Sequence, residues 1–573
     1  MRNDAPRGSS PEQPEPPWWD SEAWGFSELP AHSSQAPPPS QAPPPGYSRS
    51  PFRLNGAGPA PTWTPPPFQV HPFATAGAPP AGLRTHQLVL LLVMTHAPLI
   101  LLWAGVPAIY QFGRLVATPL VLALAGLTMV VFSVGYSGMA RRIQHRGGLY
   151  AFVAHGLGPT VGLGAAVLAA LSYMALMASL LVIFGGSLKG LLISVLRLEL
   201  PLWFCVLIGL AAFVLFVRLR LITVLWTLLL VGVVQAAAIS WIDVAAVGQP
   251  LDGNFTLAAL DPSWLLGGSF GLALCLAITS YVGSESGASY VDDTNEPRRV
   301  IPRATLLSYL ITTVTLVVSS WAVGIAVGPQ NAIVIAQGGL ESQTAGAGQP
   351  FILTVVTQLV GLGSAKEVAE LITAALVLSA LASGAMACQT VARQLSGLAR
   401  DGVLPAAMAP RADGRTPLSV GLIGPLLAGA TAFAAIMADG PLATLYAATT
   451  GGVGIVGVLT LTSLATIAWF LRTDDNEAGF FGWEGPVVAA GIAMVSTGFV
   501  YVYAVLRFPK VVPEGSRYGW VFSVLTGGAF LGGVVWALAL RVWRPDVLAR
   551  IGRSRPSGDQ SVTPARGRRS TPA

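Results

Sequence analysis

Long apolar runs recur along most of this chain, and they restrict its possible folds more than any other feature. A helix needs about 20 mostly apolar residues to cross the hydrocarbon core of a bilayer, and runs of that length alternate here with short polar breaks. A chain with 53% hydrophobic and 10% charged residues cannot cover a water-soluble surface. We therefore predict an all-α membrane protein with 12 transmembrane helices in a domain spanning residues 85–542. The helices are expected to start near His86, Val116, Thr160, Leu202, Ile222, Ser263, Ala304, Glu367, Pro417, Leu442, Pro486 and Gly519.

The two ends of the chain differ in composition from this domain. Residues 1–84 hold nearly half of the 44 prolines and few aliphatic residues, which predicts a disordered, proline-rich tail. Its PPP tracts could bind a protein partner, although a solvated tail without a partner is the simpler interpretation. Residues 543–573 are expected to form a basic C-terminal tail.

Arginines concentrate in alternate loops of the predicted domain. Arg141, Arg298 and Arg400 lie in three loops that would share one side of the membrane, whereas the loop at residues 243–261 has no Lys or Arg. Because positively charged loops stay in the cytoplasm, we expect a multi-pass protein of the plasma membrane with both termini cytoplasmic. The loop with Arg507 and Lys510 runs against this rule.

Several functional classes lack their sequence signature. The arginines are spread over loops rather than gathered in one patch, which argues against nucleic-acid binding. Cys205, Cys275 and Cys388 lie in separate apolar runs, so neither a disulfide framework nor a metal site is expected. The chain has no His-Glu-x-x-His helix and no Gly-x-x-x-x-Gly-Lys-Ser/Thr loop. We expect neither an enzyme nor an ATP-driven pump, and no cofactor.

Two predicted spans contain residues that interrupt a helix near mid-membrane depth. In the first, LLVMTHAPLILLWAGVPAIY, Pro98 lacks an N–H and its ring crowds the carbonyl of Met94. In the sixth, Gly283 and Gly287 flank Ser284–Ser286, which weakens one helical turn. A broken helix frees N–H groups suited to a carboxylate, and carbonyls suited to an ammonium group or a small cation. Two facing breaks would therefore suit a zwitterion.

Glu285 and His96 are the titratable residues of these two breaks. A charged side chain at this depth costs at least ~2.5 kcal/mol and is tolerated beside a cavity or a partner. For Glu285 we favour substrate handling or proton gating, and the structural alternative is a carboxyl that holds the freed N–H groups of its own helix. His96 fits a packing residue better than a coupling residue, but it stays a candidate. Tyr281, Ser284 and Ser286 could line the same cavity.

Ser379 and Ser383 lie one turn apart in the predicted eighth span. Their hydroxyl oxygens could bind a sodium ion, but helix packing by small residues explains them at least equally well. The three lysines, Lys189, Lys366 and Lys510, are expected outside the spans, so no lysine would act as a built-in cation. The coupling-ion candidates are therefore H⁺ and Na⁺.

Two short segments are compatible with an internal repeat. GGLYAFVAHGLG (Gly147–Gly158) precedes the predicted third span, and QPFILTVVTQLVGLG (Gln349–Gly363) precedes the eighth. Both end in Gly-Leu-Gly and would lie on opposite faces of the membrane, as two five-helix halves of opposite orientation would place them. Coincidence explains the match equally well.

At these residues the chain resembles the amino acid permease group of the amino acid-polyamine-organocation (APC) superfamily. The resemblance rests on YVGSES (Tyr281–Ser286) followed by EPRRVIPRAT (Glu296–Thr305), with support from Gly147–Pro159 and Ala392–Pro417, and it covers about residues 86–540. It implies an alternating-access carrier with a 5+5 inverted repeat, discontinuous helices 1 and 6, two additional helices and, often, proton coupling. The substrate-binding residues that the resemblance implies are Thr95, His96, Ala97, Pro98, Tyr281, Gly283, Ser284, Glu285 and Ser286.

The chain departs from the family pattern in two places. Thr95–Pro98 (THAP) replaces the glycine-rich signature of the first helix, and Ser284 stands where an aromatic or aliphatic residue is usual. Both departures leave the accepted substrate side chain open. We expect a secondary active transporter of an amino acid or a related amine such as a polyamine. The alternative is a membrane sensor on the same scaffold, which would bind its ligand without transporting it.

Overall fold

The structure is a computed structural model that describes residues 82–251, 255–344, 351–361, 363–410, 416–439, 441–473, 484–507 and 521–554. The tail predicted for residues 1–84 lies outside the described residues except for its last three, and so do residues 555–573 of the predicted C-terminal tail.

Helices dominate the described residues, which contain in addition one isolated β-bridge between Leu83 and Thr294. Ten helical stretches of this described part are long and apolar enough to cross a membrane. They are the first-span stretch Thr85–Gly113, α4 (Thr118–Arg142), α6 (Pro159–Leu191) with its π-helical end η3 (Leu192–Leu196), α8 (Leu221–Gly248), α10 (Pro297–Val327), α13 (Ala365–Arg400), α14 (Leu418–Asp439), α15 (Pro441–Phe470), α16 (Glu484–Arg507) and α17 (Val521–Trp543). The apolar helix α7 (Leu202–Val217) is shorter.

Most of these helices begin within a turn of the predicted start. Two starts were wrong: the sixth-span helix α9 (Phe270–Thr279) begins after Ser263, and α10 begins at Pro297, before Ala304. Residues 262–266 form a 3₁₀ turn instead of joining α9. Pro297 favours an earlier start of α10, because a proline at the first helical position has the required φ and its missing N–H would lack a partner there anyway.

Two lysines expected in loops lie instead in end turns of helices. Lys189 belongs to α6, which continues as η3 because no proline or glycine stops it between Leu191 and Leu196. Lys366 lies in the first turn of α13. The prediction that lysines avoid the helical spans was therefore wrong for these two residues.

The first span breaks at Ala97. There α1 (Thr85–His96) ends, and the chain continues through α2 (Pro98–Ile100), the π-helical stretch η2 (Leu101–Gly105) and α3 (Val106–Gly113). Ala97 has left-handed backbone angles, φ 52° and ψ 66°. Pro98 cannot donate to the helical ladder and disfavours the α conformation of the residue before it. The break therefore lies where Pro98 predicts it.

The sixth span breaks between α9 and the 3₁₀-helical stretch η6 (Ser284–Asp293). Gly283, at the end of this break, has φ 145°, which residues with a side chain rarely adopt. Gly283 therefore occupies a position of the sixth span where the positive φ favours glycine.

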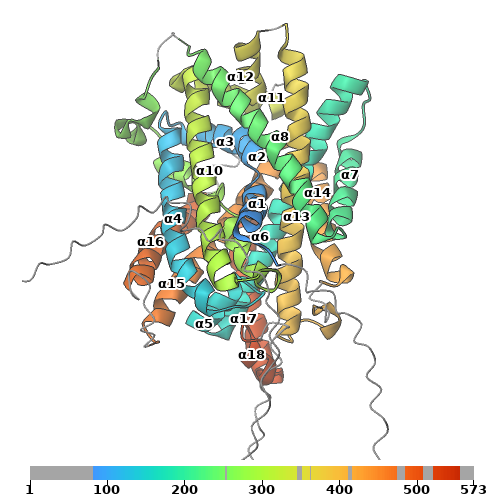
Figure 1. Ribbon diagram of the computed structural model, residues 1–573, viewed down its shortest axis with the longest axis vertical. Helices are drawn as coiled ribbons and strands as arrows, with labels where there is room; N and C mark the ends of the chain where they lie inside the picture. The colour runs from blue at the N-terminus through green and yellow to red at the C-terminus, as the bar shows by residue number, and fades with distance from the viewer. Residues whose placement is uncertain are drawn as a thin grey trace, which may run out of the picture. The chain divides into compact units, whose positions relative to one another are not determined.

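The broken first span lies in the middle of the helix bundle. In Figure 1, α1 lies between α10 and α13, and it packs against both and against α8. Helix α6 packs against α13, α15 and α17. The short helices α5 (Leu149–Leu157) and α12 (Phe351–Val360), which precede α6 and α13, lie at opposite ends of the bundle (Figure 1). Helix α11 (Pro329–Thr344) lies near α12.

Ion pairs tie several elements together at the end of the bundle that holds α5. Arg146, which follows α4, and Arg400 of α13 both pair with Asp292 of η6, at 3.1 and 2.7 Å. Arg393 of α13 pairs with the adjacent Asp293 at 3.1 Å. The second half of the sixth span is thereby fixed to α13 and to the segment before α5.

The last described residues fold back onto this same end. Helix α18 (Pro545–Arg550) buries Val547, and Ile551 follows it into the interior. Asp401, directly after α13, is buried and receives hydrogen bonds from several parts of the chain. The donors are the backbone N–H of Gly552 at 2.9 Å, the Ser554 hydroxyl at 2.6 Å, the Tyr150 hydroxyl at 3.0 Å and Nε2 of His145 at 3.1 Å.

Candidate functional site

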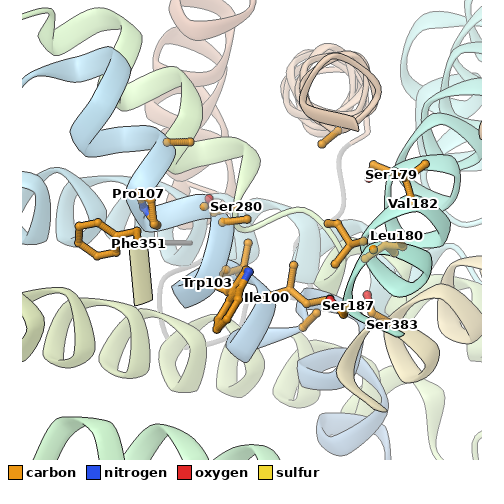
Figure 2. Close-up of a pocket in the computed structure, with 18 of the residues that line it drawn as sticks. Ile100, Trp103, Pro107, Ser179, Leu180, Val182, Ser187, Ser280, Phe351 and Ser383 are labelled. Carbon is orange, nitrogen blue, oxygen red and sulfur yellow. The ribbon is translucent and has the colours of Figure 1, made fainter. Parts of the chain in front are cut away.

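A cavity of about 970 Å³ lies beside the two helix breaks. Thr95, His96 and Ala97 of the first break line it, as do Ser280 and Val282 of the second. Figure 2 shows how the first span, α6, α12 and α13 surround it. The labelled residues are Ile100, Trp103, Pro107, Ser179, Leu180, Val182, Ser187, Ser280, Phe351 and Ser383.

The cavity extends away from the breaks toward the end of the bundle that holds α11 and α12. Its lining there includes Phe351 and Thr357 of α12 and Lys366 and Glu370 of α13. The opposite direction, toward α5, is occupied by α1, η6 and the ion pairs of Asp292. The breaks thus lie at the inner end of a cavity that approaches one end of the bundle.

His96 joins the two breaks to α10. Its Nε2 lies 2.9 Å from the carbonyl oxygen of Tyr281, and its Nδ1 lies 3.0 Å from the Thr312 hydroxyl. Because a carbonyl oxygen only accepts hydrogen bonds, Nε2 carries the proton and Nδ1 of the neutral ring accepts from Thr312. Ser284 also approaches Nε2, at 3.2 Å. Both ring nitrogens therefore hold the broken helices in place.

Glu285 is fully buried and is surrounded by neutral donors. Its Oε1 accepts from the Tyr173 hydroxyl at 2.5 Å, and its Oε2 accepts from the Gly283 N–H at 2.8 Å and from the Tyr309 hydroxyl at 3.4 Å. The carboxyl thus binds a freed N–H of its own broken helix, as the structural alternative requires. It also has a link to the cavity, since Tyr173 lines the cavity.

The two serines of α13 have different environments. Ser383 lines the cavity and donates to the carbonyl oxygen of Thr95 at 2.8 Å. Ser379 donates to Oε1 of Gln235 on α8 at 2.9 Å. The structure therefore brings Ser383 to the first break and turns Ser379 toward α8.

The remaining predicted site residues lie behind the cavity surface. Pro98 is buried at the start of α2. Tyr281 is buried, and its hydroxyl donates to the carbonyl of Leu122 on α4 at 2.9 Å. Ser286 donates to the Gly283 carbonyl at 2.6 Å and so closes the turn after the break. These contacts fix the shape of the two breaks.

A family model described as "Amino acid permease" matches residues 90–530. The chain belongs to the amino acid permease family. Among solved structures, the permease is similar to the crystal structure of a mutant manganese transporter from Eremococcus coleocola, with a TM-score of 0.53 and 12% identity over 82% of this chain and 95% of that chain. At this identity the likeness concerns the fold alone. No curated protein matches the permease.

Family membership and the ten apolar stretches among its described residues make the permease a multi-pass membrane transporter of a small molecule. The structure also brings to the candidate site five residues that the sequence did not single out. They are Trp103 and Tyr173, which line the cavity, Tyr309 and Thr312, which reach Glu285 and His96, and Gln235, which reaches Ser379. The polar atoms within long apolar runs were the available signal for all five.

Proposed function

We propose that this permease is a secondary active transporter that moves an amino acid or a related amine by alternating access. The observation that carries the proposal is the cavity that ends at two helix breaks, at Ala97 and at Gly283. In the proposed architecture, 12 transmembrane helices form a 5+5 inverted repeat with two additional helices. The placement of α5 and α12 at opposite ends of the bundle supports such a repeat (Figure 1).

The two breaks supply complementary polar groups for a zwitterion. The helical stretch Pro98–Gly113 begins at the first break, and a helix start presents N–H groups and a partial positive charge, which favour a carboxylate. Carbonyl oxygens at Ser280–Val282 would accept from the ammonium group. In this proposal Thr95–Pro98 and Tyr281–Ser286 form the binding site. Some of these residues would contact the substrate and others would shape the backbone that does.

The proposed cycle requires access from each side of the membrane in turn. The described conformation has its cavity toward α11 and α12, while Asp292 and Asp293 hold η6 closed against α13 at the other end. We assign the cavity to the outside and the ion pairs to the cytoplasm, with both termini cytoplasmic and the protein in the plasma membrane. The arginines of the ion-pair end support this orientation.

In this proposal a proton gradient drives transport, and Glu285 binds and releases the coupled proton. Tyr173 donates to Glu285 and lines the cavity, so a proton could reach the carboxyl through this hydroxyl. Na⁺ bound near Ser383 and the Thr95 carbonyl is the alternative coupling ion, with Ser379 in a supporting position. His96 is a second proton candidate. The proposed cycle contains no chemical conversion of the substrate, so the protein would not be an enzyme.

Uptake into proteoliposomes tests both parts of the proposal. An amino acid or amine that raises the unfolding temperature of the purified protein serves as substrate. Glu285→Gln should abolish the dependence of uptake on the pH gradient, while Glu484→Gln at the exposed start of α16 should not. Uptake with unchanged pH dependence in Glu285→Gln would remove the proton proposal.

Pro98→Ala addresses the helix break itself. Alanine restores the N–H that Pro98 lacks and should let the first span close, which would weaken substrate binding. Pro159→Ala, at the start of α6, is the matched control. Unaltered affinity in Pro98→Ala would count against the broken-helix site. A sensor would bind substrate without accumulating it in the liposome, so the same assay separates the sensor from the carrier.

A further inference from the structure

We propose that the cavity selects substrates with a bulky, uncharged, apolar side chain, and that Trp103 is the main specificity-determining residue. The inference rests on the proposed amino acid transport, and it narrows the substrate class to neutral amino acids such as leucine or phenylalanine. Basic amino acids, acidic amino acids and polyamines would be poor substrates.

The backbone places Trp103 where a substrate side chain would lie. Trp103 is at the centre of the π-helical stretch η2, which is separated from the first break by the single turn α2. A π-helical turn carries an extra residue and is frequent at functional sites. The indole is partly buried and lines the cavity (Figure 2). A side chain attached to an amino acid held at the break would therefore meet it.

Apolar side chains complete this region of the cavity. In the view of Figure 2, Trp103 and Ile100 lie between Phe351 of α12 and Leu180 of α6. Leu176 of α6 belongs to the same lining. Burying a large aliphatic or aromatic side chain against such a surface favours binding over glycine by about tenfold or more. The size of the cavity, about 970 Å³, leaves room for it.

The charges of the lining do not suit a cationic or anionic substrate side chain. Among the described lining residues the carboxylate and ammonium groups are Glu370 and Lys366, whose Oε1 and Nζ lie 3.8 Å apart. Ser194 also donates to Glu370. Glu285 lies behind Tyr173, with both carboxyl oxygens already hydrogen-bonded. A charged side chain in the apolar region would lose its hydration without gaining an ionic partner.

His96 does not change this charge balance. It is the titratable group of the lining at the break, and both its nitrogens already have partners, the Tyr281 carbonyl and the Thr312 hydroxyl. The neutral ring is the form that this pair of partners supports. The region around Trp103 therefore recognises size and apolar surface rather than charge.

The test uses the purified full-length protein with leucine, phenylalanine, glycine, lysine, glutamate and spermidine. We expect leucine and phenylalanine to raise the unfolding temperature at the lowest concentrations and to bind at least about tenfold more tightly than the other four. Tighter binding of lysine, glutamate or spermidine would overturn the inference and leave the proposed amino acid or amine transport standing. No binding by any of the six would overturn the proposed function together with the inference.

Variants of two tryptophans test whether Trp103 causes the selectivity for apolar side chains. Trp103→Ala should weaken phenylalanine binding at least about tenfold and change glycine binding less than about threefold, and Trp103→Phe should restore most of the loss. Trp536→Ala, on an exposed face of α17, should bind phenylalanine like the unmodified protein. Equal losses for glycine and phenylalanine in Trp103→Ala would overturn the assignment of Trp103.

Discussion

Gly283→Ala tests whether the second break is set by backbone geometry. Gly283 has φ 145° and ψ −42°, a region that residues with a Cβ occupy at a cost of about 1–3 kcal/mol. A Cβ built there would also lie 3.0 Å from Cγ2 of Thr95 and 3.2 Å from Cδ2 of His96. The substitution therefore strains the contact between the two broken helices as well as the backbone of one.

The chain has two ways to respond, and both are costly. If the backbone of residue 283 keeps its conformation, the alanine is held in a strained region of φ and ψ. If the backbone relaxes, the N–H of residue 283 leaves Oε2 of Glu285, and the Tyr281 carbonyl moves away from His96. Losing a hydrogen bond to a carboxylate costs about 1.5–3 kcal/mol. We therefore expect Gly283→Ala to lose about 2 kcal/mol of stability by either route.

Thermal unfolding of the purified protein measures this loss. Gly491→Ala on α16 is the matched control, because a Cβ there meets no atom within 4 Å and alanine favours the helix. Gly283→Ala should unfold at a lower temperature than the unmodified protein, and Gly491→Ala at the same or a higher one. An unfolding temperature of Gly283→Ala equal to that of the unmodified protein, with unchanged ligand binding, would refute the reasoning.

Three further substitutions probe separate contacts. Tyr173→Phe removes the 2.5 Å donor of Glu285 and should cost about 1.5–3 kcal/mol in thermal unfolding; a loss no larger than that of Tyr309→Phe, whose bond is 3.4 Å, would contradict this. Gly156→Ala would place its Cβ against the carbonyl of Ala465, so α5 must move from α15 and the protein should lose about 1–3 kcal/mol in thermal unfolding; an unfolding temperature equal to that of the unmodified protein would contradict this. Burial raises the pKa of Asp401, but its hydrogen bonds with His145, Gly552 and Ser554 outweigh this and hold the pKa below its usual range. Because the folded-state pKa is lowered, this stabilisation is complete above the unfolded pKa of about 3.9 and is lost as the pH falls toward the folded value. The unfolding temperature should therefore drop more steeply with acidification in the unmodified protein than in Asp401→Asn, and equal slopes would exclude the effect.

Local sequence signals predicted the helices and the two breaks. Apolar runs mark the spans because the bilayer demands them, and Pro98 and Gly283 act on their own backbone. Charged residues misled the prediction at Pro297–Ala304, where arginines suggested a loop although they form the first turns of α10. Charged side chains at a helix end reach water, so charge alone does not mark the end of a helix.

Contacts between distant segments were beyond these local signals. Tyr173 and Glu285 are separated by 112 positions, and His96 and Thr312 by 216. Polar residues such as Tyr173 and Thr312 mark an inward face of α6 and of α10, but no local pattern specifies which distant segment that face contacts. The direction in which the Trp103 side chain points depends on the π-helical turn. No residue of Leu101–Gly105 predicts that turn from the sequence.

The docking of residues 545–554 has a practical consequence for anyone who shortens this chain. The end of the sequence resembles a dispensable tail, which would suggest a truncation before Pro545. Such a truncation would remove two hydrogen-bond donors of Asp401, and it would expose the apolar surface that Val547 and Ile551 cover. A purification tag is better attached beyond Ser554, where it leaves the docked residues 545–554 in place.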